Sequence, residues 1–177
     1  MSWSRSTEIA RAPLAGLVLC FLAVGAAAED APACREFKWP LATESAWLAA
    51  NPAELQSGAA IDELKEGAFT VVLKPSGEVD FARPPEGKPS PDKPMGGMLS
   101  FAAVATPGTY QVTLSDEAWI DIVQNGVFRP SLDFSGVHGC PGMRKSVRFT
   151  FVQAPLVLQL SSASVAAIKI AIRRLPQ

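Results

Sequence analysis

The chain has few of the residues from which most enzyme sites are built. His138 is its only histidine, which excludes a metal site with several histidine ligands. There is no Cys-x-x-Cys pair, no Gly-x-Ser-x-Gly elbow and no glycine-rich phosphate loop. Basic and aromatic residues are not interleaved, which argues against nucleic acid as a partner. The sequence therefore predicts no catalytic residue, no metal and no cofactor.

The first 28 residues have the layout of a cleaved secretory signal peptide. Arg5 and Arg11 precede an uncharged, mostly apolar run over 12–25, and three alanines ending at Ala28 supply the small residues that signal peptidase requires. A retained membrane helix needs about 20 apolar residues, which is longer than this run. Cys20 follows a leucine inside the run, unlike the acylated cysteine of a lipoprotein. We expect cleavage after Ala28, no stable membrane anchor, and a periplasmic or secreted protein.

Two cysteines, Cys34 and Cys140, remain after cleavage. In an oxidising compartment an even pair indicates a disulfide. A bridge between them closes a loop of more than a hundred residues, which under the chain-entropy model destabilises the unfolded state by about 4–5 kcal/mol. The mature N-terminus would thereby be joined to a late loop.

The mature chain of about 150 residues is long enough for one domain with a real core. We predict a helical extension over 29–66 that packs on a β-domain over 67–177. Within the extension, Thr43 to Ala50 has helix-forming residues, with Thr43 as the expected N-cap and Asn51-Pro52 as the stop.

From Ala68 onward the apolar residues recur with a period of two, which indicates strands with one buried and one wet face. Asn125-Gly126 favours a tight hairpin turn between two of them. Seven to nine short strands with Gly and Pro turns are typical of an all-β protein, an antiparallel β-sandwich with a short N-terminal helix. The expected strands lie at 69–73, 78–82, 98–105, 109–114, 118–123, 147–151, 156–160 and 168–172.

One segment, residues 84–94, is rich in proline. Five prolines in eleven residues exclude a helix or a central strand and predict an extended, mobile loop. It is either a solvated connection between strands or a lid or partner-binding arm.

Three residues are candidates for ligand binding: Trp119, Asp121 and His138. If Ile120 and Ile122 face the core, Trp119 and Asp121 face outward, and an exposed indole beside a carboxylate is a platform for a sugar ring, a peptide or a cation. The opposite register, or a loop covering Trp119, would remove that platform. His138 lies in a glycine-rich loop beside the predicted disulfide, where it is either a hydrogen-bonded loop residue or a ligand contact.

Catalytic alternatives remain on the same residues. Asp116, Glu117 and Asp121 flank Trp119, an arrangement that a glycosidase could use. His138 with a free Cys140 would make a nucleophile pair, which oxidation of the cysteine would abolish. Methionines 95, 98 and 143 with His138 could form a soft site for Cu(I), although methionine is also an ordinary core residue.

The segments Gly108–Leu114 and Ala118–Ile122 resemble the central strands of pre-peptidase C-terminal-like domains. This resemblance implies a jelly-roll-like or related secreted β-sandwich that acts as a non-catalytic accessory or targeting module. The mature chain is also similar to a group of short exported proteobacterial proteins with no assigned activity. Some of these carry a homogentisate dioxygenase label, which implies an iron site with several histidines that His138 alone does not supply.

Three functions follow from these observations. The first is a non-catalytic binding or accessory protein for an unknown small ligand or an envelope protein. The second is a small secreted hydrolase or metal-dependent enzyme that uses His138 or Asp121. The third is a structural or inhibitory envelope protein.

Overall fold

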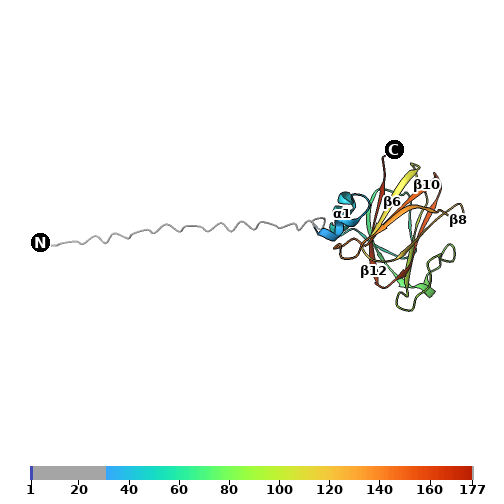
Figure 1. Cartoon of the computed structure of the whole chain (residues 1–177), viewed down its shortest axis with the longest axis horizontal. Helices are drawn as coiled ribbons and strands as arrows, with labels where there is room; N and C mark the ends of the chain where they lie inside the picture. Colours follow the sequence, from blue (N-terminus) through green and yellow to red (C-terminus); the bar gives the residue numbers. More distant parts are fainter. Residues whose placement is uncertain (2–30, 177) are drawn as a thin grey trace.

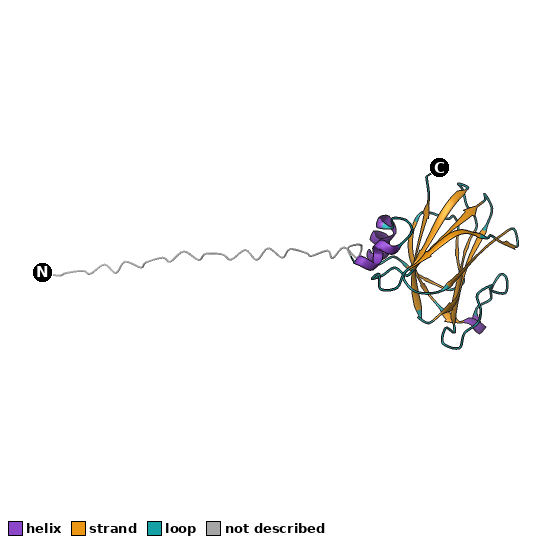
Figure 2. Cartoon of the chain, in the orientation of Figure 1, coloured by secondary structure: helices purple, strands orange, loops and turns teal. Residues whose placement is uncertain are grey.

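Two six-stranded β-sheets packed face to face form the body of the protein (Figures 1 and 2). The structure is a computed structural model that describes Met1 and residues 31–176. The predicted signal peptide therefore lies, apart from Met1, outside the described residues. Within the described part, no helix has the length and apolar character needed to cross a bilayer. The all-β sandwich with one short α-helix that the sequence predicts is confirmed.

The first sheet contains the last strand of the chain at its centre. Its order is β1-β3-β12-β6-β10-β9, so β12 lies between β3 and β6. The strands of this sheet are β1 (Glu54–Gln56), β3 (Gly67–Val72), β12 (Ala167–Arg174), β6 (Gly108–Leu114), β10 (Lys145–Phe151) and β9 (Ser131–Gly136).

The second sheet ends in a very short strand, β8. Its order is β2-β5-β11-β7-β8, and β4 also pairs with β5. Asn125 and Gly126 both have positive φ between β7 and β8, which confirms the predicted tight turn. The strands are β2 (Ala59–Ile61), β4 (Lys74–Pro75), β5 (Met95–Phe101), β11 (Leu156–Ala163), β7 (Trp119–Gln124) and β8 (Val127–Phe128).

The sequence predicts an antiparallel sandwich, but two of the pairings are parallel. The short strands β1 and β2 pair parallel with β3 and β5 respectively. Both lie within the 29–66 segment that was predicted to be helical, so this segment also contributes a strand to each sheet. Strands of three residues carry too few alternating side chains for the period to be visible in sequence.

Aliphatic and aromatic side chains fill the interior between the sheets. The three alternating series in the last third of the chain all point inward, as predicted. Ile168, Ile170 and Ile172 of β12 are at most 1% exposed, and Phe149 and Phe151 of β10 are at most 2% exposed. Leu156, Leu158 and Leu160 of β11 close the core from the other sheet.

The N-terminal segment covers the outer face of the first sheet. It contains the 3-10 turn η2 (Pro32–Glu36) and the helix α1 (Ala42–Ala49), and α1 contacts β12 and β3. The helix lies one residue from its expected position, but the predicted Thr43 cap is wrong because Leu41 occupies the N-cap position with no side-chain bond. Glu44 is fully buried under α1, and its Oε1 accepts hydrogen bonds from Arg173 Nε (2.7 Å) and Gln111 Nε2 (2.6 Å).

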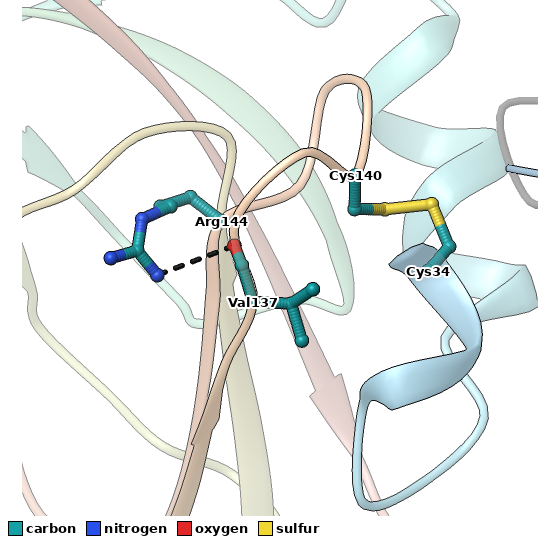
Figure 3. The surroundings of a disulfide bond; sticks show 4 residues. All are labelled: Cys34, Val137, Cys140 and Arg144. Carbon is teal, nitrogen blue, oxygen red and sulfur yellow. Dashed lines mark hydrogen bonds between the residues drawn. A yellow bond between two sulfur atoms is a disulfide. The ribbon is translucent and has the colours of Figure 1, made fainter. Parts of the chain in front are cut away.

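The predicted disulfide is present and fixes this segment in place. Cys34 in η2 is bonded to Cys140 in the loop between β9 and β10, 106 residues later in the chain (Figure 3). Cys140 is buried in a second apolar cluster with Trp39, Leu48 and Met143. A buried disulfide is compatible with an oxidising, extracellular compartment.

One predicted strand is wrong. Residues 78–82 alternate in sequence, but the structure has the 3-10 turn η3 (Ser76–Glu78) followed by a loop. Val79 and Phe81 are only partly buried because this segment has already left the sheet after β4. The following residues, 79–94, run as a long loop before β5 (green in Figure 1).

Candidate functional site

An open groove runs along the side of the sandwich where β8 is too short to cover the interior. β7 pairs with β11 along its whole length, but β8 pairs only with Val123 and Gln124. On the side away from β11, the first half of β7 therefore pairs with no strand of the described structure. In the facing sheet β9 is the edge strand, and its Phe134 is 60% exposed and lines the groove.

The groove has an apolar floor and a charged rim, and its volume is about 290 Å³. Apolar side chains from both sheets form its floor: Trp119, Ile120, Phe134, Val147 and Phe149. The charged rim consists of Glu86, Asp121, Arg129 and Lys145. We refer to this feature as the β7–β9 groove.

Exposed apolar side chains concentrate on the same side of the molecule. In residues 31–176 the large hydrophobic side chains that stay exposed are Trp119 (43%), Val127 (54%), Leu132 (58%) and Phe134 (60%). All four belong to β7, β8 and β9. Two of them, Trp119 and Phe134, line the β7–β9 groove, and exposed apolar side chains beside a groove are typical of an interaction site.

β7 positions Trp119 and Asp121 together, as the sequence suggested. Ile120 and Ile122 face the core, so Trp119 and Asp121 share the outer face. The indole Nε1 of Trp119 donates a hydrogen bond to Asp121 Oδ1 (2.7 Å), and the backbone N–H of Glu86 donates to Asp121 Oδ2 (3.0 Å). Asp121 is only 3% exposed, so its carboxylate fixes the orientation of the indole ring more than it meets solvent.

The environment of Asp121 perturbs its ionisation. Burial raises the pKa of Asp121, and the hydrogen bonds from Trp119 and Glu86 oppose that rise without cancelling it. A carboxyl with a raised pKa beside a groove is a common mark of a functional site. Both of its oxygens, however, already accept hydrogen bonds from the protein.

Lys145 completes the site from the opposite sheet. By alternation it shares the inner face of β10 with Val147, and its side chain reaches β7, where Nζ donates to the carbonyl of Ala118 (3.1 Å). The ammonium lies 5.2 Å from the centroid of the Trp119 ring, within cation–π range. Burial lowers the pKa of Lys145, which places a partly desolvated cation at one end of the groove.

The proline-rich segment lies against the outer face of the second sheet. Gln159 of β11 exchanges two hydrogen bonds with the backbone of Arg83, and Ser162 Oγ donates to the carbonyl of Lys88. A Cβ added to Gly87 would lie 2.7 Å from the Trp119 side chain, so only glycine allows this close approach. Asp121 faces outward as expected, yet this loop buries it.

A second hollow lies on the loop side of Trp119. Its volume is about 380 Å³, and it is lined by Trp119, Glu86, Glu117 and three lysines, Lys88, Lys93 and Lys145. Glu117 is paired with Lys93 (2.8 Å) and with Arg144 (3.1 Å). The Trp119 ring therefore separates an apolar groove from a basic hollow.

His138 lies apart from this site. It is exposed in the loop after β9, and its Nε2 is 2.9 Å from Arg144 Nη2. Arg144 also donates to the carbonyl of Val137 (Figure 3). His138 lines neither the β7–β9 groove nor the second hollow, so the structure brings Trp119 and Asp121 together but not His138.

The residues suggested for metal binding lie on separate elements. Met143 is buried beside Cys140, whereas Met95 and Met98 belong to β5 of the other sheet. Across residues 31–176, no group of three or more His, Cys, Asp or Glu side chains is arranged to hold a metal ion. The disulfide also removes the proposed His138–Cys140 nucleophile pair, because Cys140 has no free thiol.

Sequence reasoning missed Phe134, Val147, Phe149 and Lys145 as site residues. Val147 and Phe149 were correctly predicted to point inward, but that pattern does not show that the strand opposite them is missing. The only available signal was the Asn125-Gly126 turn, which is followed after only three residues by Pro130 and so limits the length of β8.

Comparison with known proteins gives no further guide to this site, since no protein-family model, curated protein or solved structure matches the chain.

Proposed function

We propose that the protein is an exported, non-catalytic binding protein whose ligand enters the β7–β9 groove beside Trp119. The observation that carries the proposal is the concentration of all four exposed large apolar side chains of residues 31–176 on the strands that border this groove. Apolar surface in a concave site with a few placed charges is the usual character of a binding site.

The proposed location is the periplasm or the extracellular space. The leader-like first 28 residues and the Cys34–Cys140 disulfide both favour an oxidising destination. The resemblance to pre-peptidase C-terminal-like domains supports the same reading, since such domains are secreted accessory modules.

Binding of an apolar fluorescent dye tests the proposal. Anilinonaphthalene sulfonate combines aromatic rings with an anion, which suits an apolar floor with Lys145 at one end. We expect saturable binding to the purified, disulfide-bonded protein and competition between the dye and the natural ligand. The Phe134→Ser variant should bind the dye at least fivefold more weakly, because a large part of the apolar floor is lost.

Leu132→Ser is the matched control. Leu132 lies on the same strand with similar exposure, 58% against 60%, but does not line the groove. Dye binding should persist in this variant. Equal weakening by both substitutions, or no binding to the folded wild-type protein, would show that the groove is not the site.

One observation favours a second candidate function, a small hydrolase with Asp121 as general acid. The raised pKa of Asp121 in a groove wall suits such a role, which would also require one of its two hydrogen-bonded oxygens to be released toward the substrate. Hydrolysis of chromogenic glycosides that Asp121→Asn abolishes would support it. A lack of turnover by the wild-type protein with every such substrate would leave binding as the function.

A further inference from the structure

On the edge of β7 that borders the groove, backbone N–H and C=O groups face away from β11 and pair with no strand of the described structure. The backbone N–H of Arg129 donates to the carbonyl of Ile122 (2.7 Å), so the N–H and C=O of Ile122 point away from β11. Backbone groups alternate in direction along an antiparallel strand, so those of Ile120 point the same way. No strand in the described part of the chain pairs with Ile120 on that side.

A strand added at this position would continue the line of β8. The chain follows that line as far as Arg129. Pro130 has no N–H to donate, and after it the chain crosses to β9 in the other sheet. An added strand that continues β8 in the same direction is antiparallel to β7, as β8 itself is. Such a strand would run from the Arg129 end of the groove toward Lys145.

The side chain of a residue opposite Ile120 would enter the apolar floor. Directly paired residues in a sheet point to the same face, and Ile120 faces the interior with Val147 and Phe149 across from it. The volume of about 290 Å³ is at the lower limit of small-molecule sites, about 300–1,000 Å³. It suits one large aliphatic or aromatic side chain with its backbone.

The ammonium of Lys145 at one end of the groove determines which side chain fits at the next inward-facing position of the added strand. That residue stands two positions further along the added strand, opposite Ala118 and beside Lys145. The Lys145 ammonium has three protons and donates one of them to the carbonyl of Ala118, so two protons remain for a further acceptor such as a carboxylate. Asp121 is 3% exposed and its oxygens accept bonds from the Trp119 indole and the Glu86 backbone N–H. Of the charged side chains that line the groove, this leaves Lys145, Arg129 and Glu86 to meet a ligand, and two of these three are cationic.

We infer that the groove binds an extended segment of a protein partner by strand addition to β7, with an apolar side chain opposite Ile120 and a carboxylate side chain two residues later against Lys145. This inference rests on the proposed function, whose site it shares. Main-chain hydrogen bonds supply affinity in such complexes, and alternate side-chain pockets supply specificity.

A matched pair of peptides tests the inference on the wild-type protein. The probe is acetyl-Thr-Phe-Thr-Glu-Thr-amide, and its control carries N-methylphenylalanine in place of phenylalanine. The two peptides share every side chain, but the control lacks the N–H that would bond to Ile120 C=O. We expect the control to bind about tenfold or more weakly and the parent to slow amide hydrogen exchange at Ile120 by about tenfold at saturation.

A third peptide, with Gln in place of Glu, tests the charge. It should bind the wild-type protein about threefold or more weakly than the parent, and the difference should disappear in the Lys145→Met variant. The same loss in both proteins would show that the carboxylate does not meet Lys145.

Failure of the inference is distinguishable from failure of the proposed function. If the dye binds in the groove but the N-methyl peptide binds as tightly as its parent, or Ile120 exchange is unchanged, strand addition is overturned and groove binding stands. If neither dye nor peptide binds the folded protein, both proposals are overturned.

Discussion

At the scale of single residues, Asp121 links ionisation to the geometry of the binding site. Its carboxylate holds the Trp119 indole through a 2.7 Å hydrogen bond while being almost fully withdrawn from water. The orientation of the exposed ring therefore depends on a group that is costly to keep charged.

The pH dependence of stability should report this cost. Burial makes the pKa of Asp121 higher in the folded than in the unfolded protein. A carboxyl of this kind contributes most stability below its unfolded pKa, and the contribution is lost as pH rises through the folded pKa. The free energy of unfolding of wild type minus that of Asp121→Asn, from urea titrations, should therefore be larger at about pH 3 than at about pH 7. An equal difference at both pH values would contradict the assignment.

Gly87 offers a second test at this scale. In Gly87→Ala the new methyl group would meet Trp119 Cβ and Cγ and Ser161 Oγ at 2.7 Å, so the loop must move away from the sheet. We expect a loss of about 1–3 kcal/mol in the free energy of unfolding and a shift in tryptophan fluorescence. Gly77→Ala is the control, because nothing lies within 4 Å of its added Cβ. Equal effects of the two substitutions would contradict the close packing of the loop on Trp119.

At the scale of elements, strands with strict alternation were predictable from the sequence, but the strands with which they pair were not. β10, β11 and β12 lie where the sequence placed them because each carries three large apolar residues at a period of two. The 78–82 segment has the same period, but it lies in no sheet because its backbone bonds locally: the N–H of Val79 donates to Ser76 and that of Phe81 donates to Val79. Pairing depends on which strand lies alongside, and this information is not local in sequence.

β12 should be the element least tolerant of change. Ile170 is fully buried at the centre of the first sheet. Ile170→Asp would bury a charge without a partner, so we expect no cooperative thermal unfolding and a circular dichroism spectrum without native strand signal. Ile170→Val, as the control, should stay folded and lose about 0.5–1.5 kcal/mol of stability. A cooperative transition in the aspartate variant would contradict the central position of β12.

At the scale of the whole molecule, one covalent bond holds the N-terminal segment on the sandwich. The cysteine pairing was predictable because only Cys34 and Cys140 remain after the expected cleavage, and the disulfide prediction is confirmed. The candidate site was predictable only in part. The sequence identified Trp119 and Asp121 on one strand, but the groove depends on the shortness of β8, for which Pro130 so soon after the Asn125-Gly126 turn is the only signal.

Loss of the disulfide should lower stability without changing the fold. The bridge spans 106 residues, so replacing both cysteines by serine should cost about 4–5 kcal/mol through the entropy of the unfolded chain. The melting temperature should fall while the circular dichroism spectrum stays that of a β protein. An unchanged melting temperature would contradict a structural role for the bond, and reduction of the wild-type protein should reproduce the effect.

The position of β12 also bears on when the chain can fold. In chain order residues 167–174 follow every other strand, yet they stand between β3 and β6. Until they are available, the first sheet lacks its middle and the two halves cannot join. In the exported protein that we propose, this delay would keep the chain from folding until its last strand has been made, and a folded domain could not pass a narrow membrane channel.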